Sequence, residues 1–288
     1  MFTGSIRSPR PLRVVTLATL GLVAAAIAVY AATGADIEWP NVSAPVGNLP
    51  RWLVVSLIIF FAAIVSSIVG FASSAISGGF ILHFVPNGVE AVQIMMIASI
   101  GIQTYSVAGL WRSIQWRRCV PFILGGIAAL PIGIALLMIL SSQTYLLGMG
   151  VGLICYGLYM LPRRPTLIMS GRRPMADALA GALGGITGPL AAFPGACVTI
   201  WCAMRGWNKV EQRTIYQPYI LVMQLIGVSA ISLLQPQGTF EPTLLGYALP
   251  ASAGAIFGLR VFHAVTDVQF QRMLNLALVA SGSALLFK

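Results

Sequence analysis

The chain has 288 residues, of which 58% are hydrophobic and only 8% are charged, and its formal net charge is +10. A soluble domain carries about 25% charged residues, so this composition excludes a water-facing globular surface and predicts a polytopic, all-α transmembrane bundle. The positive charge does not indicate nucleic-acid binding, because the basic residues lie in short loops between apolar segments.

Apolar segments follow one another along the chain, separated by loops that are rich in Pro, Gly or Arg. They cover residues 14–33, 52–70, 72–85, 91–110, 119–140, 143–161, 175–191, 194–204, 214–234, 243–262 and 271–287. The first segment follows a basic start, so it is either a retained helix or a cleaved signal peptide. Its length favours the retained helix, and in both cases the loop before Arg51 lies on the outer side.

The basic residues predict how these segments are oriented. They gather before the first segment and in the loops at 111–118, 163–173, 205–213 and 260–272. Placing these regions in the cytoplasm leaves only Arg51 and Lys288 outside, in agreement with the positive-inside rule. We therefore expect a multi-pass protein whose N-terminus is cytoplasmic.

This orientation leaves two stretches that are too short to cross the membrane twice. Residues 52–85 and 175–204 must each leave and return on one side, whereas two full crossings need about 40 residues. We expect each stretch to form a short broken or re-entrant helix pair, because unwound backbone is tolerated where protein or a water-filled cavity satisfies it. Two breaks that enter from opposite faces predict an inverted repeat with a site at the midplane.

An internal repeat agrees with this topology. The stretch from Val89 to Gln103 aligns without a gap with the stretch from Val210 to Gln224, and the alignment pairs Glu90 with Glu211. The predicted organisation is an N-terminal helix and outer loop (1–51), transmembrane repeat 1 (52–161), a cytoplasmic linker (162–174) and transmembrane repeat 2 (175–288).

Several motifs resemble those of one family. "GFASSAISGGFILHFVP" followed by "GVEAVQIMM", and "GALGGITGP" followed by "RGWNKVEQRT", resemble the TauE/SafE family of membrane anion exporters over residues 52–287. The resemblance implies export of sulfite or a related organosulfur anion across a bacterial inner membrane, and hence a role in sulfur metabolism. The chain has no HExxH, no GxSxG and no paired intramembrane aspartates, so we expect no enzyme, and no cofactor or metal site.

Glycines and hydroxyl side chains in the two short helix pairs are the first candidates for substrate binding. The free N–H groups and the positive dipole end of a half-helix can hold an oxyanion, and glycines let the backbone approach it. The candidate residues are Ser74, Ser77, Gly78, Gly79, Gly185, Thr187 and Gly188. The alternative is that these small residues only permit close helix packing.

Polar residues of the following helices are further candidates. Gln103 and Gln224 occupy matching positions and either line the substrate path or bond neighbouring helices. Tyr216 and Gln217 share a helix with Gln224, and Arg213 either meets the anion at the inner mouth or snorkels to the interface. At the two helix starts, a capping role is favoured for the glutamates paired by the repeat, with proton coupling as the alternative.

These observations favour a membrane transporter that exports a small anion by alternating access. The alternatives are a passive anion channel and a non-transporting membrane scaffold or assembly factor. The expected partners are a small anionic substrate and the lipid bilayer, with protons as a candidate coupling ion and a homodimer as a candidate assembly.

Overall fold

The fold is an all-helical bundle in a computed structural model that describes residues 50–71, 73–85, 88–139, 150–151, 153–155, 157–159, 161, 171, 173–234 and 241–286. This part of the chain is almost entirely helical and contains no strand. Its helices or helical stretches at Arg51–Val69, Glu90–Ser113, Trp116–Leu136 and Pro242–Ala264 are long and apolar enough to cross a membrane. The predicted class of all-α membrane protein is confirmed. The predicted helix at 14–33 lies outside the described residues, as do parts of 143–161 and of the linker.

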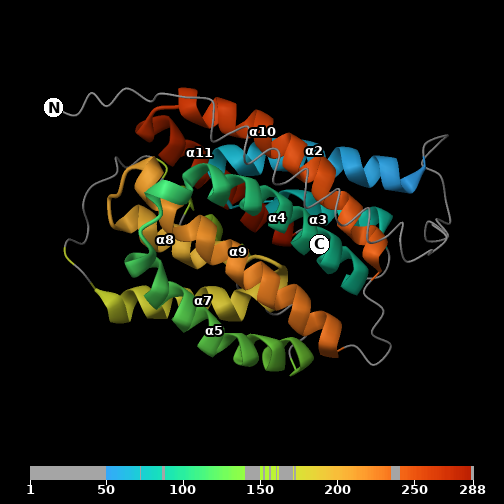
Figure 1. Ribbon diagram of the computed structural model, residues 1–288, viewed down its shortest axis with the longest axis horizontal. Coiled ribbons are helices and arrows are strands. Elements are labelled where there is room, and N and C mark those ends of the chain that lie inside the picture. The colour runs from blue at the N-terminus through green and yellow to red at the C-terminus, as the bar shows by residue number, and fades with distance from the viewer. Residues whose placement is uncertain are drawn as a thin grey trace.

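Each half of the chain begins with two helices separated by a break. A long helix, a short helical segment and a further helix follow (Figure 1). The first half contains α2 (Arg51–Val69), α3 (Ser73–Phe84), α4 (Gly88–Leu110), η1 (Trp111–Ser113) and α5 (Trp116–Ile139). The second half contains α7 (Pro174–Ala191), α8 (Gly195–Met204), α9 (Lys209–Leu234), η2 (Pro242–Tyr247), α10 (Ala248–Ala264) and α11 (Asp267–Leu286). Both predicted pairs, α2–α3 and α7–α8, break close to the predicted positions, although α2 by itself is long enough to cross a membrane.

Some helices begin earlier than the apolar segments predict, and α9 shows why. Its first turns are polar, but the Asn208 side chain accepts hydrogen bonds from the N–H groups of Val210 and Glu211 at 3.0 and 2.9 Å. The Glu211 carboxylate in turn accepts a bond from the Asn208 N–H at 3.4 Å. This reciprocal capping box stabilises a helix start that hydrophobicity alone does not mark.

Long helices of one half pack along long helices of the other. In Figure 1, α5 lies beside α7 and α2 lies beside α10, and these two pairs have extensive contacts. Glycines make both contacts close: a Cβ at Gly185 of α7 would collide with the backbone of Gly126 in α5. A Cβ at Gly258 of α10 would likewise collide with the Ile64 carbonyl of α2. This packing of helices from one half against helices of the other is compatible with the predicted inverted duplication, which stays a prediction.

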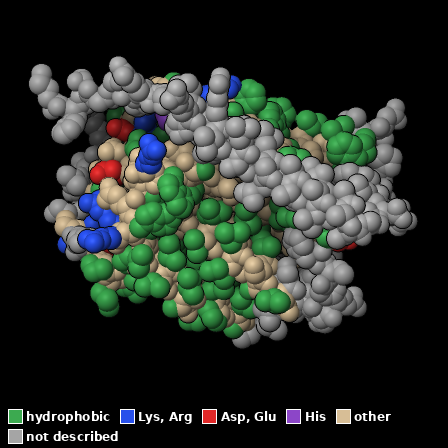
Figure 2. Space-filling view, viewed as in Figure 1, with side chains coloured by type: hydrophobic (Ala, Val, Ile, Leu, Met, Phe, Trp, Pro, Cys, Tyr) green, Lys and Arg blue, Asp and Glu red, His purple; other side chains and the backbone are tan. Residues whose placement is uncertain are grey.

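The face of the bundle that α5 and α7 form is apolar. Figure 2 shows hydrophobic side chains spread over the face that α5 and α7 form, with Lys and Arg side chains gathered at one end. Leu124 and Ile132 of α5 and Leu179 and Leu183 of α7 are among the exposed ones. An apolar face with basic residues at one end suits a surface that faces lipid.

Candidate functional site

The break between α2 and α3 depends on the backbone of Gly70. This residue has φ +100°, in the left-handed region that favours glycine, and its N–H turns back toward the carbonyl of Ser66. A Cβ at Gly70 would also overlap the ring of Tyr216 from α9. Both the backbone angle and the neighbouring ring therefore require glycine at the point where α2 ends.

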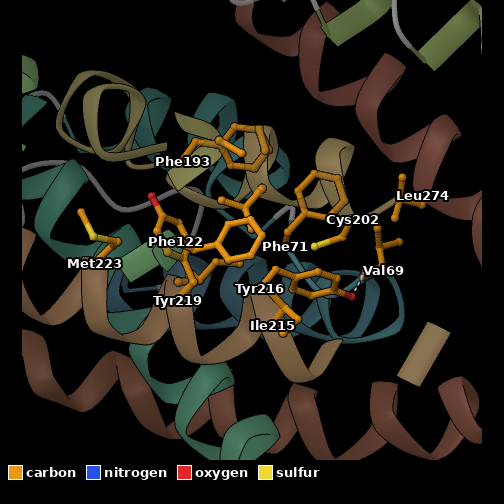
Figure 3. Close-up of a cluster of buried hydrophobic side chains, with 14 of the residues drawn as sticks. Val69, Phe71, Phe122, Phe193, Cys202, Ile215, Tyr216, Tyr219, Met223 and Leu274 are labelled. Atoms are coloured by element: carbon orange, nitrogen blue, oxygen red, sulfur yellow. Dashed lines mark hydrogen bonds between the residues drawn. The ribbon is translucent and has the colours of Figure 1, made fainter. Parts of the chain in front are cut away.

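Side chains from α4 and α9 satisfy the carbonyls at this helix end. The last carbonyls of a helix have no partner within the helix, and Ser67 and Val69 are buried, so their carbonyls cannot rely on water. Arg213 Nη2 donates to the Ser67 carbonyl at 2.6 Å, Tyr216 Oη to the Val69 carbonyl at 3.1 Å, and Gln103 Nε2 to the Gly70 carbonyl at 3.5 Å. Figure 3 shows the Tyr216 bond. Three predicted site residues thus meet at the end of α2.

The break between α7 and α8 has a related arrangement. Ala192 follows α7 with φ 51°, again left-handed. Its carbonyl accepts a bond from Gln224 Nε2 at 3.3 Å, and the same nitrogen lies 3.4 Å from Ser99 Oγ. Thr187 Oγ1 lies 3.4 Å from the carbonyl of Phe193, the next residue. Gln103 and Gln224, which the repeat alignment pairs, therefore each bond a carbonyl at a helix break.

Arg213 is the charged centre of the first break. Its side chain is 0% exposed, so it does not snorkel to an interface. The guanidinium lies over the ring of Phe262 in α10, 4.0 Å from the centroid. No acidic side chain of the described residues lies within 4 Å of it, and its Nη1 has no hydrogen-bond partner.

The amide of Gln217 links this arginine to α4. Its groups all find partners when its oxygen faces Arg213, at 2.9 Å from Nη2 and 3.0 Å from Nε. Its nitrogen then donates to Ser106 Oγ at 3.0 Å and to Gln103 Oε1 at 3.1 Å. A network of neutral polar groups therefore links one buried positive charge to α2 and α4.

The predicted residues of the short helices lie in two different settings. Ser74, Ser77, Gly78 and Gly79 lie in the first two turns of α3, directly after the break. Ser77 Oγ donates to the Ser73 carbonyl at 2.8 Å. Gly185, Thr187 and Gly188 instead lie in the last two turns of α7, before the second break. Gly185 packs against α5 there, which is the close packing given above as the alternative.

The glutamates at the two helix starts have local partners. The Glu90 carboxylate pairs with Arg51 at 3.3 Å, and Glu211 belongs to the capping box of α9. The predicted capping role is confirmed for Glu211.

Sequence reasoning missed Phe262 and Ser67, which contact Arg213 from α10 and α2. Nothing near either residue in the sequence marks it, because both contacts depend on how distant helices pack. Gly70 had a signal that could have identified it, since a lone glycine ends the apolar segment before "FASS".

The fold and this site define a polytopic helical membrane protein with a buried, unpaired cation beside a helix break. A family model described as Sulfite exporter TauE/SafE matches residues 55–285, so the chain belongs to this family. Members of the family are membrane transporters of sulfur anions such as sulfite and are not enzymes. No curated protein and no solved structure matches the chain in the comparisons.

Proposed function

We propose that this chain exports sulfite, a sulfonate or a related small organosulfur oxyanion across a bacterial inner membrane. The observation that carries the proposal is the buried Arg213 guanidinium, whose Nη1 has no partner. An unpaired buried charge is costly, and an ionisable residue at membrane depth usually marks a substrate or ion pathway. A small anion beside Arg213 would supply the missing charge.

Neutral groups around the arginine would complete the site. Gln217 contacts the arginine, while Gln103 and Tyr216 bond carbonyls at the same helix end. The N-terminal turn of α3 follows this break. The free N–H groups of that turn suit an oxyanion. In this proposal Ser74, Ser77, Gly78 and Gly79 line the α3 side, while Gly185, Thr187, Gly188 and Gln224 line the second break.

Alternating access is the proposed mechanism. The glycine-packed pairs α2–α10 and α5–α7 would each move as one rigid body, because their backbones are in close contact. The two breaks would then act as hinges around the site in a pair of inverted repeats. Protons are the proposed coupling ion, with Glu90 as the carrier because Glu211 caps α9, in a homodimer with cytoplasmic N-termini.

Transport assays with the purified full-length protein in proteoliposomes test the proposal. We expect saturable flux of labelled sulfite that is lost in Arg213→Gln and kept in Arg260→Gln, which removes an exposed arginine instead. Flux without saturation or proton coupling would favour a channel. If the folded wild-type protein moved no sulfur anion under any gradient, the transporter proposal would be wrong and a scaffold would be favoured.

A further inference from the structure

The charges around Arg213 bear on the charge of the anion that can bind beside it. Its contacts are the Ser67 carbonyl, the Gln217 amide and the Phe262 ring, all of which are neutral. Arg205, which is also buried, differs from Arg213 because the Asp177 carboxylate lies 3.8 Å from its guanidinium. Arg213 therefore brings one positive charge that the described part of the protein does not neutralise by an ion pair.

The end of α2 partly offsets the positive charge of Arg213. The C-terminus of a helix carries a partial negative charge equivalent to about half an electron. Arg213 Nη2 donates to the Ser67 carbonyl at that end, so the guanidinium lies in the negative part of the α2 dipole. The N-terminus of α3, which follows the same break, carries a partial positive charge of similar size that offsets this negative end, so the site offers an anion about one unit of positive charge.

His263, which follows Phe262 in α10, and Lys209, one turn before the arginine on α9, are other basic groups near this site. The His263 side chain is exposed to solvent. The Lys209 side chain has partners of its own. Its Nζ lies 4.6 Å from the centre of the Phe262 ring, but it donates to the Phe262 carbonyl at 3.0 Å and also to the Val265 carbonyl. The Asp267 carboxylate accepts a bond from the Lys209 N–H at 3.1 Å. This bond comes from the backbone and not from the ammonium group, and the lysine is partly exposed, so solvent screens its charge.

The second break has no equivalent cation. The repeat alignment places Val92 and Met96 where the first site has Arg213 and Gln217. Met96 is buried in an apolar cluster, and Val92 packs against that cluster. The charged site is therefore present once in the described part of the chain, although the helix breaks occur in both halves.

From this balance we infer that the site takes one singly charged anion, such as hydrogensulfite or a sulfonate, and discriminates against doubly charged anions such as sulfate. A monoanion and Arg213 together form a neutral pair, whereas a dianion leaves an uncompensated negative charge among buried neutral groups. Such a residual charge is costly at membrane depth. This inference rests on the proposed transport function and specifies the charge of its substrate.

Proteoliposome uptake of labelled methanesulfonate, sulfate and sulfite tests the inference. We expect methanesulfonate to be taken up at least about tenfold faster than sulfate at equal concentration. Uptake at fixed total sulfite should rise as the pH falls, in proportion to the hydrogensulfite fraction. Methanesulfonate keeps its charge over this range, so it corrects for any proton coupling of transport itself.

Gln217→Glu tests whether Arg213 sets this selectivity. The new carboxylate has nearly the shape of the amide and would face Nη2 and Nε, so it would neutralise the arginine in place. We expect methanesulfonate uptake to fall at least about tenfold. Gln269→Glu is the matched control, because Gln269 is exposed and its oxygen, which accepts bonds from Thr266, is kept.

The outcomes separate this inference from the proposed function. If sulfate moves as fast as methanesulfonate, or if folded Gln217→Glu protein keeps its uptake, the inference is wrong although the protein is a transporter. If neither anion nor sulfite moves, the proposed function itself fails. Should Gln217→Glu not fold, the ratio of methanesulfonate to sulfate uptake in the wild-type protein still decides.

Discussion

Phe71 and Phe193 pack against each other, with ring centroids 5.6 Å apart and planes inclined by 31°. Each directly follows the left-handed residue that ends a long helix, Gly70 in one case and Ala192 in the other. Figure 3 shows both rings within the buried cluster. The two helix breaks are thus in contact through the aromatic residue that follows each of them, so a movement of one break would displace the other.

Gly70→Ala should strongly destabilise the protein. Alanine at φ +100° is strained, and its Cβ would overlap the Tyr216 ring. We expect a loss of about 2 kcal/mol or more, measured as a lower Tm in detergent. Gly109→Ala is the matched control, because nothing lies within 4 Å of a Cβ at that helical position, and it should be neutral or slightly stabilising. Equal Tm values for the two variants would contradict the assigned backbone.

Replacement of Gln103 or Gln224 by leucine separates the two roles considered for these residues. Each amide donates to a carbonyl at a helix break, so its loss leaves a buried acceptor unsatisfied. We expect each substitution to destabilise the fold by about 1–3 kcal/mol, with a smaller effect for Ser229→Ala at an exposed position. Unchanged unfolding midpoints together with lost transport would instead indicate that the glutamines act only on the substrate.

The two helix breaks could be predicted from the sequence because the thickness of a membrane sets how many residues one helical crossing needs. Once the basic loops were placed on one side, residues 52–85 and 175–204 were too short for two crossings each. Each stretch was therefore expected to break where glycine or proline is frequent. The structure has them at Gly70 and at Ala192.

The contacts of the glycines and of the arginine could not be predicted in the same way. Gly185 lies in a motif rich in small residues whether it faces a ligand or a helix, and only the position of α5 shows that it packs against Gly126. The burial of Arg213 depends on α2 and α10, which are far from it in the sequence. A local pattern carries no information on which distant helix covers a side chain.

Gly185→Ala and Gly188→Ala should differ, although both glycines were candidates for substrate binding. A Cβ at Gly185 would collide with the Gly126 backbone and force α5 and α7 apart, whereas a Cβ at Gly188 meets only the side chain of Pro194 at 3.3 Å and more distant proline atoms. We expect Gly185→Ala to cost about 1–3 kcal/mol of stability, and Gly188→Ala much less. Thermal unfolding of the two purified variants makes the comparison.

The folded Gly188→Ala variant then allows a separate transport measurement. If Gly188 lies beside the anion path, sulfite flux should fall in a protein whose Tm is nearly unchanged. Full flux would remove Gly188 from the proposed site while leaving the role of Arg213 untouched.

Asp177→Asn should destabilise the contact between the start of α7 and the end of α8. Asp177 lies 3.8 Å from Arg205 Nη1 and accepts a bond from Trp201 Nε1 at 2.7 Å. Asparagine can keep the tryptophan bond but leaves Arg205 buried without an ion-pair partner, so we expect a loss of about 3 kcal/mol or more. The Arg205 guanidinium also contacts the rings of Trp201 in α8 and of Trp207 just after α8, so its position is fixed by several side chains.

Glu211→Gln is the control for the loss of a carboxylate at this same side of the bundle. Glutamine preserves the capping box with Asn208, so its Tm should stay close to that of the wild-type protein. The two variants remove the same charge and differ in whether a buried arginine loses its partner. If Asp177→Asn were no less stable than Glu211→Gln, the Arg205–Asp177 pair would not hold α7 to α8.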